Sequence, residues 1–179
     1  MRYIYIVFML VILSVEVFHP TQVFADDDYV LGPGDVISVN IFNESDMGIK
    51  GVRLPKNGVV TFPYIGDLKV NGLTVDSLKK KLIRKLKDGY LKHPQLVISI
   101  DEYRKYFVNG QVNNPGGYPY VEGLTIRKAI TIAGGITDKA SLSKILLLKE
   151  GQRDPLRLVR ALDKTIGPGD VLTIGESLF

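Results

Sequence analysis

Two aspartates follow the same glycine turn near opposite ends of this 179-residue sequence. Asp35 closes Gly32-Pro33-Gly34-Asp35, and Asp170 closes Gly167-Pro168-Gly169-Asp170. A pair of carboxylates can bind a metal ion or carry out acid–base catalysis, as in glycoside hydrolysis. An aspartate in a turn, however, commonly accepts hydrogen bonds from its own backbone. No spacing in the sequence nominates a catalytic pair, so we expect both motifs to be structural turns that each begin a strand.

The other residue types that bind metals or act as nucleophiles are scarce. The sequence has no cysteine, and its two histidines, His19 and His93, are far apart. This composition excludes a recognisable zinc site or cysteine nucleophile. The glycine turns also lack the Lys and Ser/Thr of a phosphate-binding loop. We therefore predict a protein that is not an enzyme, with no catalytic residue, no cofactor and no metal.

A row of cations is the clearest surface for a charged partner. Lys80, Arg84 and Lys87 recur at helical spacing in a chain whose 23 Lys and Arg exceed its 19 Asp and Glu, for a net charge of +4. Such a row is usually a solvated helix face, but it can also contact an anionic polymer or an acidic neighbour. Nucleic acid is not expected as a partner, because no aromatic residues alternate with these cations.

Short strands and two helices must position these residues. Thr74 can cap a helix over Val75–Lys87, and Thr125 can cap a second helix over Ile126–Ala133. Several short strands surround each helix, which predicts an α+β fold of two small domains. The polar stretch Glu102–Lys105 marks the boundary, so we place the domains at residues 26–103 and 104–179.

Local patterns also predict individual strands and turns. Val36–Ile41 and Val171–Ile174 follow the two glycine turns as strands, and Asn57-Gly58 favours a type I′ hairpin turn. Gly66-Asp67 is predicted to be a second turn, and Ser141–Lys144 a loop.

The N-terminal residues 1–25 have the layout of a cleaved secretory signal peptide. An apolar run, Tyr3–Val15, is followed by Val23-Phe24-Ala25, and we expect cleavage between Ala25 and Asp26. An uncleaved membrane anchor is the alternative, but Glu16 interrupts the run before the roughly 20 apolar residues that a spanning helix needs. Because no cysteine is available for acylation, we expect an unlipidated protein of the periplasm.

The order of the motifs along the chain resembles a known family, the outer-membrane polysaccharide export proteins of the Wza type. The first half is similar to the polysaccharide export domain and the second half to the β-grasp-like SLBB domain. The first-half motifs are Leu31-Gly-Pro-Gly-Asp-Val36, Lys56-Asn-Gly-Val-Val-Thr-Phe-Pro-Tyr-Ile-Gly66, Val70-Asn-Gly-Leu-Thr74 and Pro94-Gln-Leu-Val-Ile-Ser-Ile100. The second-half motifs are Val108-Asn-Gly-Gln-Val112, Pro115-Gly116, Leu124-Thr-Ile-Arg-Lys-Ala129, Ala133-Gly-Gly-Ile-Thr137 and Gly169-Asp-Val171.

The resemblance implies a periplasmic component of a capsular or exopolysaccharide export channel. Members of the family form homo-oligomeric rings that conduct polysaccharide cargo above an inner-membrane co-polymerase. The sequence ends five residues after Ile174, without the pore-forming helix of longer members. We therefore expect a short form that reaches the outer membrane through a separate pore protein of the β-barrel kind. Candidate contacts with the cargo or a partner are Lys80, Arg84, Lys87, Tyr118 and Tyr120.

Two other classes of function stay open at this point. A monomeric periplasmic carbohydrate-binding module would hold a saccharide tightly, whereas a conduit should bind its cargo weakly. An enzyme acting on polysaccharide would need a suitably placed pair of carboxylates. Four tyrosines could stack on sugar rings, although tyrosines in strands are more often packing residues with a hydrogen-bonding tip: Tyr103, Tyr106, Tyr118 and Tyr120.

Overall fold

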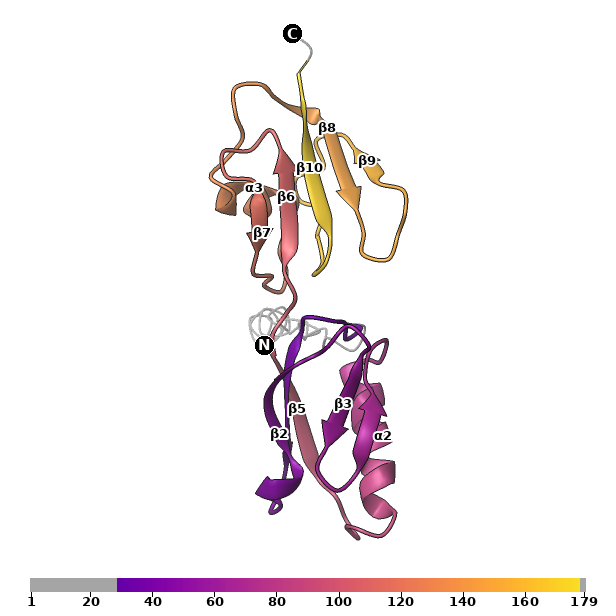
Figure 1. The fold of residues 1–179 in the computed structure, drawn as a ribbon. Helices are drawn as coiled ribbons and strands as arrows, with labels where there is room; N and C mark the ends of the chain where they lie inside the picture. The colour runs from indigo at the N-terminus through magenta and orange to yellow at the C-terminus, as the bar shows by residue number, and fades with distance from the viewer. Residues whose placement is uncertain (1–28, 178–179) are drawn as a thin grey trace, which may run out of the picture.

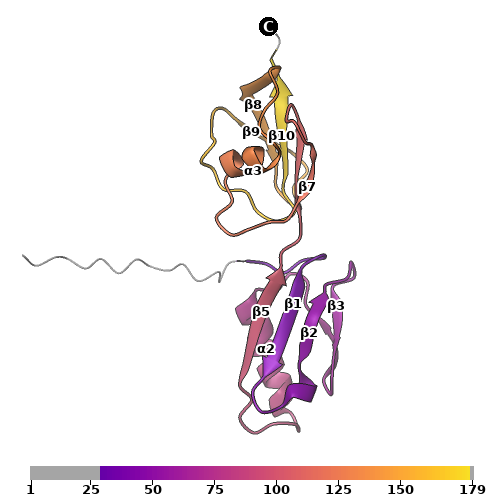
Figure 2. The same cartoon turned by 90° about the vertical axis from the view of Figure 1, so that its left-hand side faces the viewer.

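The computed structural model describes residues 29–177. The fold is α+β, as expected, and consists of two halves stacked end to end (Figure 1). Each half has its own strands and its own helix (Figure 2), and β5 of the first half leads directly into β6 of the second (Figure 1). The predicted cleavage site, Ala25 and Asp26, lies outside the described residues.

The first half is built around β1 (Val36–Ile41), the middle strand of a three-stranded antiparallel sheet. Its neighbours are β2 (Ile49–Arg53) and β5 (Leu96–Glu102). A short 3-10 helix, η1 (Ser45–Met47), joins β1 to β2. A separate hairpin pairs β3 (Val59–Phe62) with β4 (Gly66–Lys69).

Helix α2 covers one face of this half and has the predicted bounds, Val75–Lys87. The Thr74 hydroxyl caps it by accepting a hydrogen bond from the Ser77 amide. Leu78, Leu82 and Leu86 recur on one face and are fully or almost fully buried in the core shared with β1, β3 and β4. The helix therefore exposes its opposite, lysine-rich face.

The second half is a five-stranded sheet in the order β7-β6-β10-β8-β9. The chain runs through β6 (Tyr106–Gly110), β7 (Gly116–Tyr118) and α3 (Ile126–Ile132), then β8 (Ala140–Leu148), β9 (Leu156–Leu158) and β10 (Val171–Glu176). The central strand β10 is parallel to β6 and antiparallel to β8. Helix α3 contributes Ala129 and Ile130 to a second hydrophobic core, separate from that of the first half.

Two turn predictions in the first half are wrong. Gly58 has a φ of 68°, but Asn57 does not have the positive φ that a type I′ turn needs, and its Oδ1 accepts a hydrogen bond from the Val59 amide 3.1 Å away. The resulting turn joins β2 to β3, which belong to different sheets. Gly66 and Asp67 are paired residues of β4, and the turn lies at residues 63–65 instead.

The predicted loop at Ser141–Lys144 is also wrong, since β8 runs without a break from Ala140 to Leu148. Polar side chains in this segment favour a loop locally, but β8 pairs with β10 on both sides of the segment, at Ala140 and from Ile145 onward, and the register between the two strands shifts across it. Within residues 29–177, neither helix is long and apolar enough to cross a membrane.

Candidate functional site

The first Gly-Pro-Gly-Asp turn is organised by the buried carboxylate of Asp35. Its Oδ2 accepts hydrogen bonds from the Gly32 amide at 2.8 Å, the Tyr29 hydroxyl at 2.7 Å and Arg104 Nη1 at 2.9 Å. Its Oδ1 accepts a hydrogen bond from the Arg104 backbone amide at 2.8 Å. A fully buried carboxylate needs such compensation, because an unpaired charge inside a protein is very costly.

The second turn repeats this arrangement around Asp170. Its Oδ2 accepts the Gly167 amide at 2.7 Å and the Lys149 ammonium at 2.6 Å, and its Oδ1 accepts the Glu150 amide at 3.1 Å. In both turns the aspartate therefore binds its own turn, one cation, and the backbone of a segment that follows an antiparallel neighbouring strand. Each carboxylate accepts at least three hydrogen bonds from protein donors, which suits a structural role.

Arg104 connects the two halves of the molecule. Besides Asp35, its guanidinium forms an ion pair with Glu150, whose amide in turn binds Asp170. Burial alone would lower the pKa of Arg104, but its hydrogen bond to the Glu150 carboxylate and the charges of Asp35 and Glu150 outweigh burial and raise this pKa. The guanidinium is therefore held in its charged form. We call this chain of contacts, Asp35–Arg104–Glu150–Asp170, the junction network.

Aromatic rings pack beside the junction network. Tyr29 and Tyr103 meet edge to face with centroids 5.0 Å apart, and Tyr103 meets Tyr120 in the same way at 5.3 Å. The Arg104 guanidinium lies 5.4 Å from the centre of the Tyr29 ring. Burial and the hydrogen bond to the Asp35 carboxylate raise the pKa of Tyr29, so its hydroxyl stays protonated and keeps donating to that carboxylate.

A groove of about 790 Å³ opens next to these rings, and we call it the junction groove. Both halves line it, the first through Arg53 and Asp101 and the second through Pro119 and Tyr120. It offers a ring face together with groups of both charges. Such a mixture can bind a hydroxylated molecule through hydrogen bonds and stacking.

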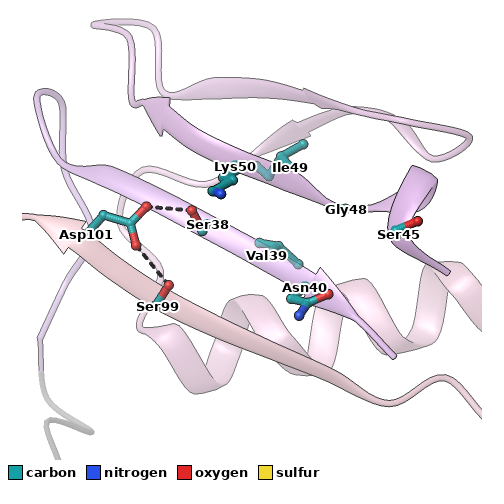
Figure 3. A pocket seen from close by; sticks show the side chains of 9 residues that line it. All are labelled: Ser38, Val39, Asn40, Ser45, Gly48, Ile49, Lys50, Ser99 and Asp101. Carbon is teal, nitrogen blue, oxygen red and sulfur yellow. Dashed lines mark hydrogen bonds between the residues drawn. The ribbon is translucent and has the colours of Figure 1, made fainter. Parts of the chain in front are cut away.

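A second hollow, of about 560 Å³, lies on the face of the three-stranded sheet that points away from α2 (Figure 3). We call it the sheet pocket. Asp101 accepts hydrogen bonds from Ser38 Oγ at 2.5 Å and Ser99 Oγ at 3.0 Å, as the dashed lines in Figure 3 show. The side chains of Lys50 and Asn40 complete the polar lining.

The two hollows share Asp101, so polar groups run continuously from the sheet pocket to the junction groove. The Gly51 amide donates to Ser38 Oγ at 2.9 Å, which fixes that hydroxyl within the irregular pairing of β1 and β2. We call this continuous run of polar groups the strip, and it presents hydroxyl, amide, carboxylate and ammonium groups to solvent. This set can exchange hydrogen bonds with a sugar but contains no activated nucleophile. Within residues 29–177, no three His, Cys, Asp or Glu side chains gather closely enough to hold a metal ion.

The predicted contact residues do not form one site. Lys80, Arg84 and Lys87 lie on the exposed face of α2, where Lys80 forms an ion pair with Asp76 at 2.5 Å. Tyr120 lines the junction groove. Tyr118 instead packs against Tyr106, with ring centroids 5.8 Å apart, and its hydroxyl donates to the Asn114 carbonyl.

Sequence reasoning missed the two residues that join the halves. Arg104 falls in a polar stretch assigned only to the domain boundary, and no sequence pattern singled out Glu150. The repeated turns offered one signal, because each buried aspartate requires a cation somewhere in the chain. Which cation it would be has no local signature, since Arg104 is 69 residues from Asp35 and 46 from Glu150.

Comparison with known protein families gives two matches that together span most of the chain. Residues 24–101 match the family described as polysaccharide biosynthesis/export protein. Residues 105–159 match the SLBB domain. The gap between them contains Arg104, the residue that links the two halves.

Three curated proteins illustrate the relatives of this sequence. The chain is 28% identical over 93% of its length to the EPS I polysaccharide export outer membrane protein EpsA of Ralstonia nicotianae, covering 44% of that protein. It is 30% identical over 68% of its length to the exopolysaccharide production protein ExoF of Rhizobium meliloti, covering 32%. It is 27% identical over 70% of its length to the polysialic acid transport protein KpsD of Escherichia coli, covering 23%. The chain thus spans less than half the length of these relatives, whose names describe production, export and transport and not an enzymatic reaction.

Proposed function

Because the chain belongs to the family of polysaccharide biosynthesis/export proteins, we propose that it is a component of an export system for a capsular or extracellular polysaccharide. The observation that carries the proposal is the order of the two matched domains, which together span residues 24–159 with a gap of three residues. Relatives named as export and transport proteins support the same role.

In this proposal the protein acts in the periplasm and guides the polymer without chemical change. Copies of the chain assemble into a ring around the cargo, and the ring connects an inner-membrane co-polymerase with a pore in the outer membrane. The two named hollows suit a passive role, since their groups are exposed and oriented by hydrogen bonds within the protein. Exposed hydrogen bonds contribute little net free energy each, which allows a sugar chain to bind and leave.

We assign the contact with the passing polymer to the strip that joins the sheet pocket to the junction groove. Asp101 is its central group, because it lines both hollows and holds the hydroxyls of Ser38 and Ser99. Sugar hydroxyls both donate and accept hydrogen bonds, and the strip offers partners of both kinds. Tyr120 adds a ring against which the apolar face of a pyranose can pack.

Gene deletion and complementation in the source bacterium test the export role. We expect deletion to abolish secreted polysaccharide and the unchanged gene to restore it. Asp101→Ala should restore less polymer at an equal protein level, whereas the matched control Asp154→Ala, an exposed carboxylate outside both hollows, should restore it fully. Normal secretion from the deletion strain would contradict the export role.

Light scattering of the mature protein, alone and with its co-polymerase, tests the ring. We expect an oligomer of fixed stoichiometry in at least one of these conditions. A strict monomer in both, combined with tight 1:1 binding of an oligosaccharide in calorimetry, would instead establish the carbohydrate-binding module.

A further inference from the structure

The turn between β3 and β4 and the segment after α2 lie at the end of the first half away from the second half (Figure 1), and each carries an exposed tyrosine. Tyr64 lies in the turn between β3 and β4, and Tyr90 follows the C-terminus of α2. Their side chains are 59% and 48% exposed, yet the rings form an edge-to-face pair with centroids 6.4 Å apart. Neither ring belongs to a hydrophobic core, so core packing does not explain why the two rings are paired.

The backbone of Tyr64 has an unusual conformation for its residue type. Its φ is 61°, in the left-handed region, where a bulky side chain is uncommon and the backbone is strained. Gly or Asn would form the same turn at lower cost. Strained residues of this kind concentrate at functional sites, where the gain in function offsets the lost stability.

Cations adjoin this pair along the chain. Between Lys79 and Lys92 the sequence has seven Lys or Arg and one carboxylate, Asp88. Arg84, Lys85 and Lys87 are exposed, and none of them forms an ion pair within the described residues. Cations in the last turn complement the helix dipole, but that effect alone is modest at an exposed site.

We propose that Tyr64, Tyr90, Arg84, Lys85 and Lys87 form a binding site for an acidic polysaccharide, which we call the aromatic–basic end. The C–H groups of a pyranose ring carry partial positive charge and pack on the electron-rich face of an aromatic ring. The cations attract the carboxylates or other anionic groups of the polymer. The inference rests on the proposed function for the cargo being a polysaccharide, and it adds that the cargo is anionic.

An anionic membrane surface is the rival ligand, since aromatic and basic residues also gather at bilayer interfaces. The close pairing of the two rings favours the sugar. Edge-to-face contact leaves ring surface open beside the pair for a flat ligand, whereas membrane-anchoring side chains need to insert into the headgroup region. The aromatic–basic end is also distinct from the sheet pocket and the junction groove, neither of which includes its residues.

Binding of the mature protein to polygalacturonate, to neutral dextran and to phosphatidylglycerol vesicles tests the proposal. We expect binding to polygalacturonate at low salt, weakening as salt screens the charges, and no binding to dextran. The triple variant Arg84→Gln, Lys85→Gln, Lys87→Gln should bind roughly tenfold more weakly. The matched control Lys139→Gln, Arg153→Gln, Lys164→Gln changes the net charge equally on the second half and should bind as the unchanged protein does.

Tyr64→Asn separates binding from folding. Asn tolerates the left-handed region, so this variant should be at least as stable as the unchanged protein while binding polygalacturonate several-fold more weakly. Tyr90→Ser should weaken binding in the same way. Three results would overturn the proposal: no binding to polygalacturonate, an equal loss in the control triple variant, or binding unaffected by both tyrosine changes. Tight binding to vesicles alone would assign the surface to a membrane.

The proposed function and this site can fail separately. If deletion abolishes polysaccharide secretion but the protein does not bind polygalacturonate, the export role stands and the proposal of an acidic cargo is wrong. If the protein binds polygalacturonate through these residues but deletion leaves secretion unchanged, the site stands and the export role is wrong.

Discussion

The carboxylates of Asp35 and Asp170 each accept hydrogen bonds from a turn amide, a distant backbone amide and a cation. Buried ion pairs of this kind contribute little net stability, because desolvation offsets their attraction, but losing one partner is severe. At the residue scale, the motif is thus an anchor for backbone segments.

Tyr106 is the opposite case, a buried polar group without compensation. Its side chain is fully buried, and its hydroxyl has no hydrogen-bond partner in the structure. We predict that Tyr106→Phe stabilises the protein by about 1 kcal/mol, because it removes an unsatisfied hydroxyl while keeping the ring contact with Tyr118. Urea unfolding at neutral pH measures this, and a clear loss of stability would reveal a hydroxyl partner.

The pH dependence of the same variant gives an independent check. Burial raises the pKa of Tyr106 from 10.0 to about 12. The unfolded state therefore loses its proton first, and the stability linked to this group is complete below about pH 10 and is lost as the pH rises towards 12, by up to about 1.4 kcal/mol per pH unit. The advantage of Tyr106→Phe should grow across this window, and a constant difference would contradict it.

At the scale of elements, each Gly-Pro-Gly-Asp turn begins the central strand of a sheet. Asp35 precedes β1, between β2 and β5, and Asp170 precedes β10, between β6 and β8. The aspartate side chain accepts a hydrogen bond from the backbone of the segment after one neighbouring strand. Its backbone carbonyl accepts a hydrogen bond from a backbone amide at the other neighbouring strand, that of Leu54 in the first turn and that of Phe107 in the second. Each turn therefore fixes three strands at the same end of its sheet.

Comparing the stability of the variants Gly169→Ala and Gly72→Ala tests how tightly the second turn is packed. Gly169 has a φ of 81°, and a Cβ there would overlap the Glu150 carboxylate, whereas Gly72 has a φ of 84° with open space around it. Gly72→Ala should cost about 1 kcal/mol from the backbone alone. Gly169→Ala should cost at least twice as much, because the Glu150 side chain must also move. Equal shifts in the urea midpoints of the two variants would show that Glu150 yields freely.

At the scale of the whole molecule, the junction network sets how one half sits on the other. The Arg104 guanidinium is only 15% exposed and bridges Asp35 of the first half to Glu150 of the second. The tyrosines 29, 103 and 120 pack along the same junction. In a ring of copies, the first halves would form one layer and the second halves another. A fixed angle between the halves would keep these two layers in register, which links the junction network to the proposed function.

Removing Glu150 should loosen the junction without unfolding either half. Glu150→Ala deletes a partly exposed ion pair worth about 1 kcal/mol or less, while Asp35 keeps its bond to Arg104. We expect residual dipolar couplings to report a wider range of angles between the halves, with unchanged chemical shifts in both cores. Asp154→Ala, four residues away and outside the network, is the control. An unchanged range of angles would assign the rigidity to the tyrosines.

The sequence by itself determined the elements whose causes are local. Thr74 and the spacing of Leu78, Leu82 and Leu86 were sufficient for α2, because capping and burial of one face act within a few residues. Local patterns were insufficient at Ser141–Lys144, which continues the long strand β8 despite its polar composition, because β8 is paired with β10 on both sides of it, at Ala140 and from Ile145 onward. Only the tertiary structure showed that the two repeated turns are joined through Arg104 and Glu150. Arg104 is 46 positions from Glu150 and 69 positions from Asp35 in the chain. These contacts form because a buried carboxylate must be paired with a cation. That requirement does not determine where in the chain the cation lies.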